Sequence, residues 1–438
     1  MSSQRSLRVI VVAELDPGDV EMIWRVPLIS LSFALMIARN SVNEFQNANR
    51  NTGAPVETES HAQSSVDPQL KVRPAGSSSR STRLTMDVVV TDKAGNTITG
   101  LSELDVQLLD NKVPVKVEAF KASSRTSLSD GPSSKILLVV DAINSSQESL
   151  ARTYSQIQNV LDVDGGRLKQ PVEILILSDT QSVTRNAQDR TSETVALANR
   201  QAFVQRIAAS TDGLALAKTL QQIVVPITRM PDAQGAEGES EKARLSVQAL
   251  NAIGTTELLL DGPKTLIWLS PGWSPFARST KTQPALFNAI TYFADLLRDA
   301  RITLDFVDTG GVFAGAETTL PPPPNASELV FQNRAVPLPV GQPNPNWYEE
   351  YYRPVAKESQ ANMNDLALQV LAYQSGGVVL VRNNQIAQQI LRCMNDARSS
   401  YELSFEPSTI RDGAYHDVEL RIKRRNATAR FRRGYYAR

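Results

Sequence analysis

The residues best placed for chemistry follow an apolar run near position 140. Ile136 to Val140 are five apolar residues in succession, a pattern typical of a central parallel strand that is covered on both faces. Asp141 follows this run directly. Because open α/β sheets bind their ligands at the carboxyl ends of their strands, Asp141 is the first candidate for a functional residue.

Three further carboxylates, Asp179, Asp212 and Asp308, also lie where predicted elements end. Two carboxylates that meet at one edge of a sheet can act as general acid and general base, so a carboxylate-based hydrolase is an alternative function. Aspartates in such places more commonly form turns and helix caps. We therefore expect no catalytic residue and predict that the chain is not an enzyme.

The scarcity of cysteine and histidine limits other chemistry. Cys393 is the only cysteine in 438 residues, which excludes an intrachain disulfide and a thiolate metal cluster. The two histidines, His61 and His416, fall in a polar tail and in a predicted strand, so neither a histidine-based triad nor a multi-histidine zinc site is expected. The 46 basic and 46 acidic residues balance, so no global field directs the chain to nucleic acid or to a membrane.

Residues 1–39 are predicted to be an extension that carries a signal peptide at 22–39. Arg25 precedes the mostly apolar Val26 to Ala38, which is too short to span a bilayer comfortably. Our hypothesis is that translation begins at Met22, and the alternative is a buried helix or a short anchor. A secreted, periplasmic or cell-envelope protein is expected, with membrane contact only through this segment.

Two stretches of alternating apolar residues flank the centre of the chain. Residues 40–83 are rich in Ser, Asn, Gln and Pro and are predicted to be a disordered linker. Residues 84–120 are predicted to form short antiparallel strands with a turn at 110–112, and 398–438 hold three further alternating sets. Neither segment can bury its apolar face alone. We therefore expect them to pair into one accessory antiparallel, β-sandwich-like subdomain.

The centre alternates predicted strands and helices. A linker at 121–134 leads into 135–397, where this alternation predicts an α/β domain with a doubly wound, mostly parallel sheet. Predicted helices include 147–163, 191–209 and 214–225.

A proline-rich insertion at 310–358 interrupts this alternation, because proline blocks regular elements. Its aromatic residues, Trp347, Tyr348, Tyr351 and Tyr352, are expected to bind a protein partner. The alternative is that these rings attach the insertion to its own domain.

The last strands carry a basic cluster, which consists of Arg421, Lys423, Arg424, Arg425, Arg430, Arg432 and Arg433. Charged outward positions keep sheets soluble and protect their edges. No aromatic stacking platform accompanies the charge, so no nucleic-acid partner is expected.

Several motifs together carry a family resemblance. Asp141-Ala-Ile-Asn-Ser145, the alternating α/β run, and the flanks Val89-Val-Thr-Asp-Lys-Ala-Gly95 and Arg433-Gly-Tyr-Tyr-Ala437 resemble the VWFA-related domain family of bacterial secreted proteins. The resemblance covers Leu84 to Arg438. It implies a divergent, Rossmann-like von Willebrand factor type A domain at 135–397, with flanking β segments and a function in protein binding or adhesion.

The resemblance also implies where a cation site would lie. In type A domains an Asp-x-Ser-x-Ser loop, a Thr and a further Asp hold a divalent cation, which captures a carboxylate of the partner. Asp141 and Ser145 match the first loop, and Thr211, or the neighbouring Asp212, would supply the second. Ile143 replaces the first serine.

The third loop departs from the family pattern as well. Ser270 or Pro271 stands where the family has its aspartate. The implied site is thus degenerate: we expect no cofactor, with Mg²⁺ at the residual site as the alternative, and we expect Asp141 to cap a helix.

These observations lead to one expected function and three alternatives. We expect a non-enzymatic secreted or envelope protein that mediates protein–protein interaction through a type A domain with a degenerate cation site. The alternatives are an envelope-assembly scaffold, metal-dependent adhesion through the residual cation site, and the hydrolase considered above.

Overall fold

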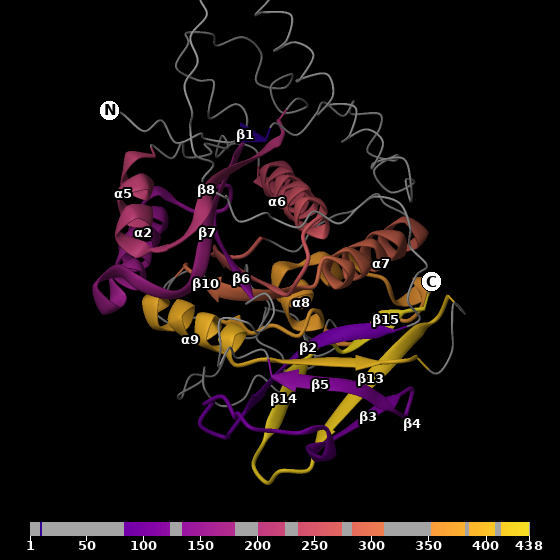
Figure 1. Cartoon of the computed structure of the whole chain (residues 1–438). Helices are drawn as coiled ribbons and strands as arrows, with labels where there is room; N and C mark the ends of the chain where they lie inside the picture. The colour runs from indigo at the N-terminus through magenta and orange to yellow at the C-terminus, as the bar shows by residue number, and fades with distance from the viewer. Residues whose placement is uncertain are drawn as a thin grey trace, which may run out of the picture. The chain divides into compact units, whose positions relative to one another are not determined.

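The computed structural model describes residues 9–10, 83–122, 134–179, 200–223, 235–273, 283–310, 352–381, 385–407 and 413–437. All of these residues belong to the same structural unit. They form one large, mostly parallel sheet flanked by helices, together with two antiparallel sheets (Figure 1). The predicted combination of α/β and antiparallel structure is therefore confirmed at this level. The predicted signal segment 22–39 lies outside the described residues.

The large sheet is built around the apolar run that ends at Asp141. Its strand order is β1-β8-β7-β6-β9-β10-β11, and β6 lies at its centre. Strands β7, β6, β9, β10 and β11 are parallel, whereas β8 is antiparallel to β7 and β1 is antiparallel to β8. The strands are β1 (Val9–Ile10), β6 (Lys135–Asp141), β7 (Arg167–Asp179), β8 (Ala202–Asp212), β9 (Lys264–Ser270), β10 (Ile302–Asp308) and β11 (Val379–Leu380).

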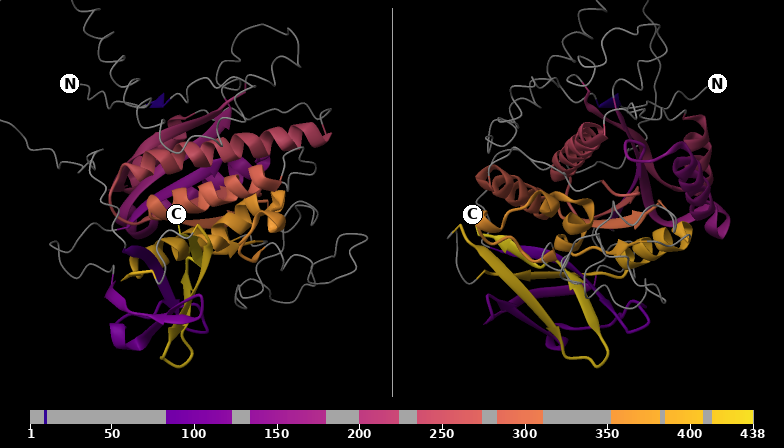
Figure 2. Two further views of the ribbon diagram at one scale, coloured as in Figure 1. Left: turned by 90° about the vertical axis from the view of Figure 1, so that its right-hand side faces the viewer. Right: turned by 180° about the vertical axis from the view of Figure 1, so that it is seen from behind.

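Helices cover both faces of this sheet, which explains why β6 and β9 are buried along nearly their whole length. On one face α2, α5 and α9 share a hydrophobic core with β6, β7 and β9. On the other face lie α6, α7 and α8 (Figure 2). The helices are α2 (Gln147–Leu161), α5 (Gly213–Gln222), α6 (Gly235–Leu258), α7 (Gln283–Asp299), α8 (Leu368–Gln374) and α9 (Ile386–Arg398).

One predicted helix is a strand. The sequence 191–209 contains several good helix formers, but its described part belongs to β8, and 191–199 lie outside the described residues. Ala202, Val204 and Ile207 are buried there. Pairing with β7 therefore overrides the local helix propensity.

The two ends of the described chain pair with each other in two four-stranded antiparallel sheets. One sheet has the order β14-β2-β12-β5 and the other β15-β13-β3-β4, so each contains strands from both ends, as expected. The apolar faces of the two sheets form one core. We call this part of the molecule the sandwich. Its strands are β2 (Leu84–Thr91), β3 (Val106–Asp110), β4 (Val113–Val115), β5 (Val117–Ala122), β12 (Tyr401–Phe405), β13 (Tyr415–Ile422), β14 (Thr428–Phe431) and β15 (Gly434–Tyr436).

Local backbone geometry in the sandwich agrees with its turn residues. Asn111 and Lys112 have φ of 49° and 68°, as the predicted turn requires. The carboxyl-terminal segment has four strands instead of the expected three. The additional strand is β15, which follows shortly after β14. Gly434 begins β15, and a Cβ atom there would lie 2.3 Å from the backbone carbonyl oxygen of His416 in β13. A close approach between β15 and β13 thus requires glycine at this position.

Ion pairs and carbonyl contacts join the sandwich to the large sheet. Arg301 donates to Asp87 at 2.9 Å and to Glu402 at 2.8 Å. Arg430 forms an ion pair with Asp396 of α9. Arg432 donates to the backbone carbonyls of 294 and 302, and burial, with Arg298 nearby, lowers its pKa to about 10. We call this region the joint.

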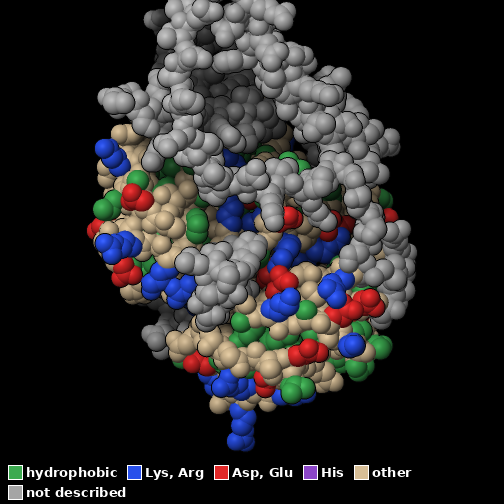
Figure 3. Space-filling model, viewed as in Figure 1, with side chains coloured by type: hydrophobic (Ala, Val, Ile, Leu, Met, Phe, Trp, Pro, Cys, Tyr) green, Lys and Arg blue, Asp and Glu red, His purple; other side chains and the backbone are tan. Residues whose placement is uncertain are grey.

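The joint changes the interpretation of the basic cluster near the carboxyl terminus. Arg430 and Arg432 point into the joint, and Arg421 pairs with Glu419 at 2.7 Å. Over the visible described surface, basic and acidic side chains are intermingled (Figure 3). The expectation that Arg430 and Arg432 occupy outward positions of their strands is therefore wrong.

Candidate functional site

Asp141 lies where the strand order of the large sheet reverses. Along the chain, β6 comes before both of its neighbours, β7 on one side and β9 on the other. Open α/β sheets bind ligands at the carboxyl ends of their strands at such a switch point. Asp141 ends β6 and Ser270 ends β9. The candidate functional site is therefore the region around these two residues.

The carboxylate of Asp141 is fully buried and accepts five hydrogen bonds. Its Oδ1 accepts from the backbone N–H groups of Ile143 and Asn144, each at 3.1 Å. Its Oδ2 accepts from the side chains of Asn144 at 2.8 Å, Trp268 at 3.1 Å and Ser270 at 2.8 Å. A carboxylate offers about four lone-pair positions. Donors of the protein itself therefore use the accepting capacity of this group.

Further hydrogen bonds fix the turn that follows Asp141. Asn144 Nδ2 also donates to Ser246 Oγ of α6 at 2.8 Å. Ser146 is the N-cap of α2, because its Oγ accepts from Ser149 N–H at 3.2 Å. The expectation that Asp141 caps this helix is therefore wrong. Asp141 instead closes its own turn and connects that turn to β9.

Thr211 lies at the opposite end of the strands from Asp141, because β8 is antiparallel to β7. Asp141 is aligned with Leu177 near the end of β7, whereas Asp212 is aligned with Arg167 at its beginning. Those two positions of β7 are about 30 Å apart at the usual rise of a strand. Neither Thr211 nor Asp212 can supply a ligand beside Asp141, and this expectation is wrong. Asp212 is instead the N-cap of α5.

The residues at the switch point do not fit a divalent cation. Ile143 is 1% exposed and has no side-chain oxygen, and Ser145 is 8% exposed. A hard cation requires several oxygen ligands. The oxygens of Asp141 already accept hydrogen bonds from the protein, and the Ser270 hydroxyl is one of the donors. In the part of the chain that the structure describes, no group of three or more His, Cys, Asp or Glu side chains is placed to hold a metal ion.

Two buried tryptophans complete the site, and the motif-based prediction did not include them. Trp268 and Trp273 pack edge to face with ring centroids 5.3 Å apart. Trp273 Nε1 donates to the carbonyl of Leu366 at 2.9 Å, which attaches the loop after β9 to the segment before α8. A tryptophan within a buried strand requires a partner for its N–H group. The tryptophan in the predicted strand 265–269 therefore indicated that a hydrogen-bond acceptor lies beside it. In the structure that acceptor is Asp141.

The other carboxylates at strand ends have separate structural partners. Asp179 of β7 pairs with Arg200 at 3.7 Å, and both side chains are buried. Asp308 Oδ1 of β10 accepts from Gly310 N–H at 2.8 Å and closes a turn. In the strand order, β9 separates β6 from β10. Asp179 and Asp308 thus each take part in a structural contact, an ion pair and a turn respectively.

The aromatic residues of the insertion are only partly described. Trp347, Tyr348 and Tyr351 lie outside the described residues. Tyr352 is 4% exposed and packs edge to face on Tyr373 of α8, with centroids 5.3 Å apart. Tyr352 is thus attached to its own domain, so the expectation that it binds a partner is wrong.

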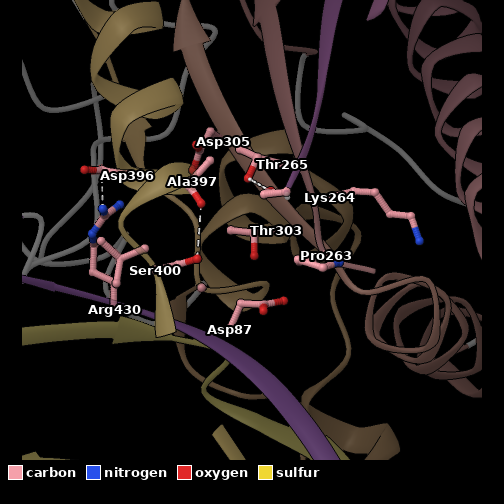
Figure 4. A pocket seen from close by; sticks show the side chains of 13 residues that line it. Asp87, Pro263, Lys264, Thr265, Thr303, Asp305, Asp396, Ala397, Ser400 and Arg430 are labelled. Carbon is pink, nitrogen blue, oxygen red and sulfur yellow. Dashed lines mark hydrogen bonds and ion pairs between the residues drawn. The ribbon is translucent and has the colours of Figure 1, made fainter. Parts of the chain in front are cut away.

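A small cavity lies within the joint, near the amino-terminal ends of β6, β9 and β10 and therefore at the opposite end of these strands from Asp141 (Figure 4). Asp305, Asp396 and Arg430 line one side of it, and Asp87 lies on the sandwich side. The cavity volume of ≈ 20 Å³ is enough for one or two water molecules and too small for an organic substrate.

Comparisons with known proteins gave no match: no protein-family model and no curated protein matches the sequence. Among the described helices, none is long and apolar enough to cross a membrane.

Proposed function

We propose that this chain is a secreted or cell-envelope protein of the VWFA-related type, and that it binds another protein without a metal ion. The observation that carries the proposal is the hydrogen-bonded carboxylate of Asp141 at the switch point. This position on the sheet is where the resemblance puts a cation. Five donors of the protein stand there in place of a ligand set.

The arrangement of the large sheet supports the type A assignment. Counted along the chain, the six strands from β6 onward have the order 3-2-1-4-5-6, which doubly wound sheets use. The motif Asp141 to Ser145 lies at the centre of that order, directly before α2. The antiparallel β8 and the sandwich built from both ends are additions to the basic doubly wound pattern.

The chemistry of the site favours binding over catalysis. Asp141 is fully buried, and its oxygens accept from donors of the protein such as Trp268 and Ser270, so it is not presented to a substrate. A role in envelope assembly is the second candidate, and the signal segment expected at 22–39 agrees with both. Pull-downs from culture medium and from envelope fractions distinguish a released binding protein from an envelope scaffold.

Removal of metal ions should leave both stability and partner binding unchanged. We expect the same melting temperature in excess chelator, Mg²⁺ or Mn²⁺, because a ligand raises it only by binding the folded state. Differential scanning calorimetry measures the melting temperature. A pull-down with and without chelator measures partner capture.

Isothermal titration with Mg²⁺ is the experiment that could contradict the metal-independent proposal. Micromolar binding to the unmodified protein that is lost in Asp141→Asn would disprove the metal-independent proposal and favour cation-dependent adhesion. Asp212→Asn is the matched control, since Asp212 is an exposed carboxylate at the other edge of the same sheet.

A further inference from the structure

The joint contains a buried carboxylate that the proposed function does not use. Asp305 lies in the middle of β10 and is 3% exposed. Its Oδ1 accepts from Val378 N–H at 2.8 Å, and the thiol of Cys393 lies beside the carboxylate. A buried ionised carboxylate needs a positively charged partner or several donors. Asp305 therefore depends on the charges that surround it.

Among the described residues, no cation forms an ion pair with Asp305. Arg430 of β14 favours its charge, but Arg430 forms its ion pair with Asp396 of α9. Asp396 itself repels a charge on Asp305. On the sandwich side Asp87 is paired with Arg301. The other charged groups around this cluster are Arg392 near Cys393 and Glu402 and Arg432 near Asp87.

Lys264 lines the same cavity but does not pair with Asp305. Its side chain points away from Asp305 (Figure 4). Its Nζ donates to the carbonyls of Leu260 and Ala300 at the ends of two helices. An ionised Asp305 is therefore stabilised only by the Val378 N–H group and by Arg430, a cation that it shares with Asp396.

We propose that Asp305 makes the joint sensitive to pH: α9 and β14 pack firmly against β10 when Asp305 is protonated, and this packing loosens when Asp305 is ionised. The elements concerned meet at Asp305 itself, since Cys393 and Asp396 come from α9 and Arg430 comes from β14.

The direction of the effect follows from proton binding. Burial raises the pKa of Asp305 from 3.8 to about 6, with Asp396 adding to the rise and Arg430 opposing it. A carboxyl group exposed by opening has its ordinary pKa, so the closed state binds the proton more tightly than the open state. Opening should therefore become more favourable as pH rises from about 4 to about 6.5, and should level off above that range.

Cys393 provides a direct measurement of this opening. It is the only cysteine of the chain, is fully buried, and touches Asp305. The rate at which a pyridyl disulfide labels Cys393, divided by the rate for the urea-unfolded chain at the same pH, gives the open fraction. Between pH 4.5 and 7.5 we expect this fraction to rise by about 25-fold in the full-length protein, as the two pKa values require.

Two variants and one control test the role of Asp305. Asp305→Asn should make the normalised labelling rate independent of pH. Asp396→Asn frees Arg430 to pair with Asp305 and should shift the rise to lower pH. Asp308→Asn changes a carboxylate three residues away on the same strand and should keep the profile of the unmodified protein.

The contrary results are equally defined. An unchanged rise with pH in Asp305→Asn, or a flat profile in the unmodified protein, would overturn the proposal. If Asp305→Asn fails to fold, the Asp396→Asn profile decides: no shift in its midpoint would overturn the proposal too. None of these measurements involves a partner, so their outcome is independent of the proposed function.

Discussion

Replacement of Asp141 by alanine should lower the free energy of unfolding by at least about 3 kcal/mol. The substitution removes the acceptor of five hydrogen bonds, and it leaves the buried N–H of Trp268 and the hydroxyl of Ser270 without this partner. Each buried polar group that loses its partner costs about 1–3 kcal/mol. Urea denaturation followed by tryptophan fluorescence measures the loss, because Trp268 contacts Asp141 directly.

Asp212→Ala is the matched control for this experiment. Asp212 is an exposed N-cap of α5, whose side chain accepts from Ala215 N–H at 2.9 Å. Loss of a cap costs about 0.5–2 kcal/mol, which is the effect that the helix-cap hypothesis had assigned to Asp141. Equal losses in the two variants would show that the hydrogen bonds around Asp141 contribute little beyond a cap.

Replacement of Glu257 by glutamine should destabilise the protein by about 3–5 kcal/mol, the usual cost of removing one partner from a buried ion pair. Glu257 of α6 is fully buried and pairs with Lys135 at 3.1 Å and with Arg206 at 3.0 Å. Glu173 of β7 pairs with the same two cations, each at 2.7 Å. The four charges balance, so the loss of one carboxylate leaves one positive charge uncompensated.

A double variant, compared with Glu257→Met, separates charge balance from the other effects of removing the Glu257 carboxylate. Glu257→Met together with Lys135→Met leaves Arg206 paired with Glu173, so the double variant should be more stable than Glu257→Met alone. The exposed Glu148, which lies 3.8 Å from Arg152, is the control, and Glu148→Ala should change stability by less than about 1 kcal/mol. A double variant less stable than both single variants would contradict the importance of charge balance.

The sequence predicted elements whose side-chain pattern is strong within a short window. The run Ile136 to Val140 and the turn at Asn111 and Lys112 were predicted correctly, because burial on both faces and positive φ each leave a local signal. β8 was mistaken for a helix, since its partner β7 and not its own propensity determines its conformation. Prediction therefore failed where the deciding contact lies far away in the sequence.

The candidate site shows the same limit. Asp141 and its position at a strand end were predicted, because they follow from the local motif. The donors that occupy it include Trp268 and Ser270, more than 120 residues later in the chain. Thr211 was assigned to the site from the family resemblance, as part of a loop between two predicted helices, but the antiparallel β8 places it at the opposite end of the sheet. The chemistry of the site thus depends on topology as well as on residue type.

The construction of the sandwich from both ends of the chain has a consequence for synthesis. β2 pairs with β12 and β14, so it must wait for some 310 or more residues before either partner leaves the ribosome. Domains generally fold as units and from the amino-terminal side during synthesis. Strands of 84–122 would then have unpaired edges, which favour wrong pairing with other chains. Folding of the large sheet and its helices through α9 removes most of the loop-closure entropy, because it brings Lys135 and Arg398 into one folded body before the last strands arrive. Truncation after α9 should therefore yield a chain that aggregates through its first strands, even though its large sheet is complete.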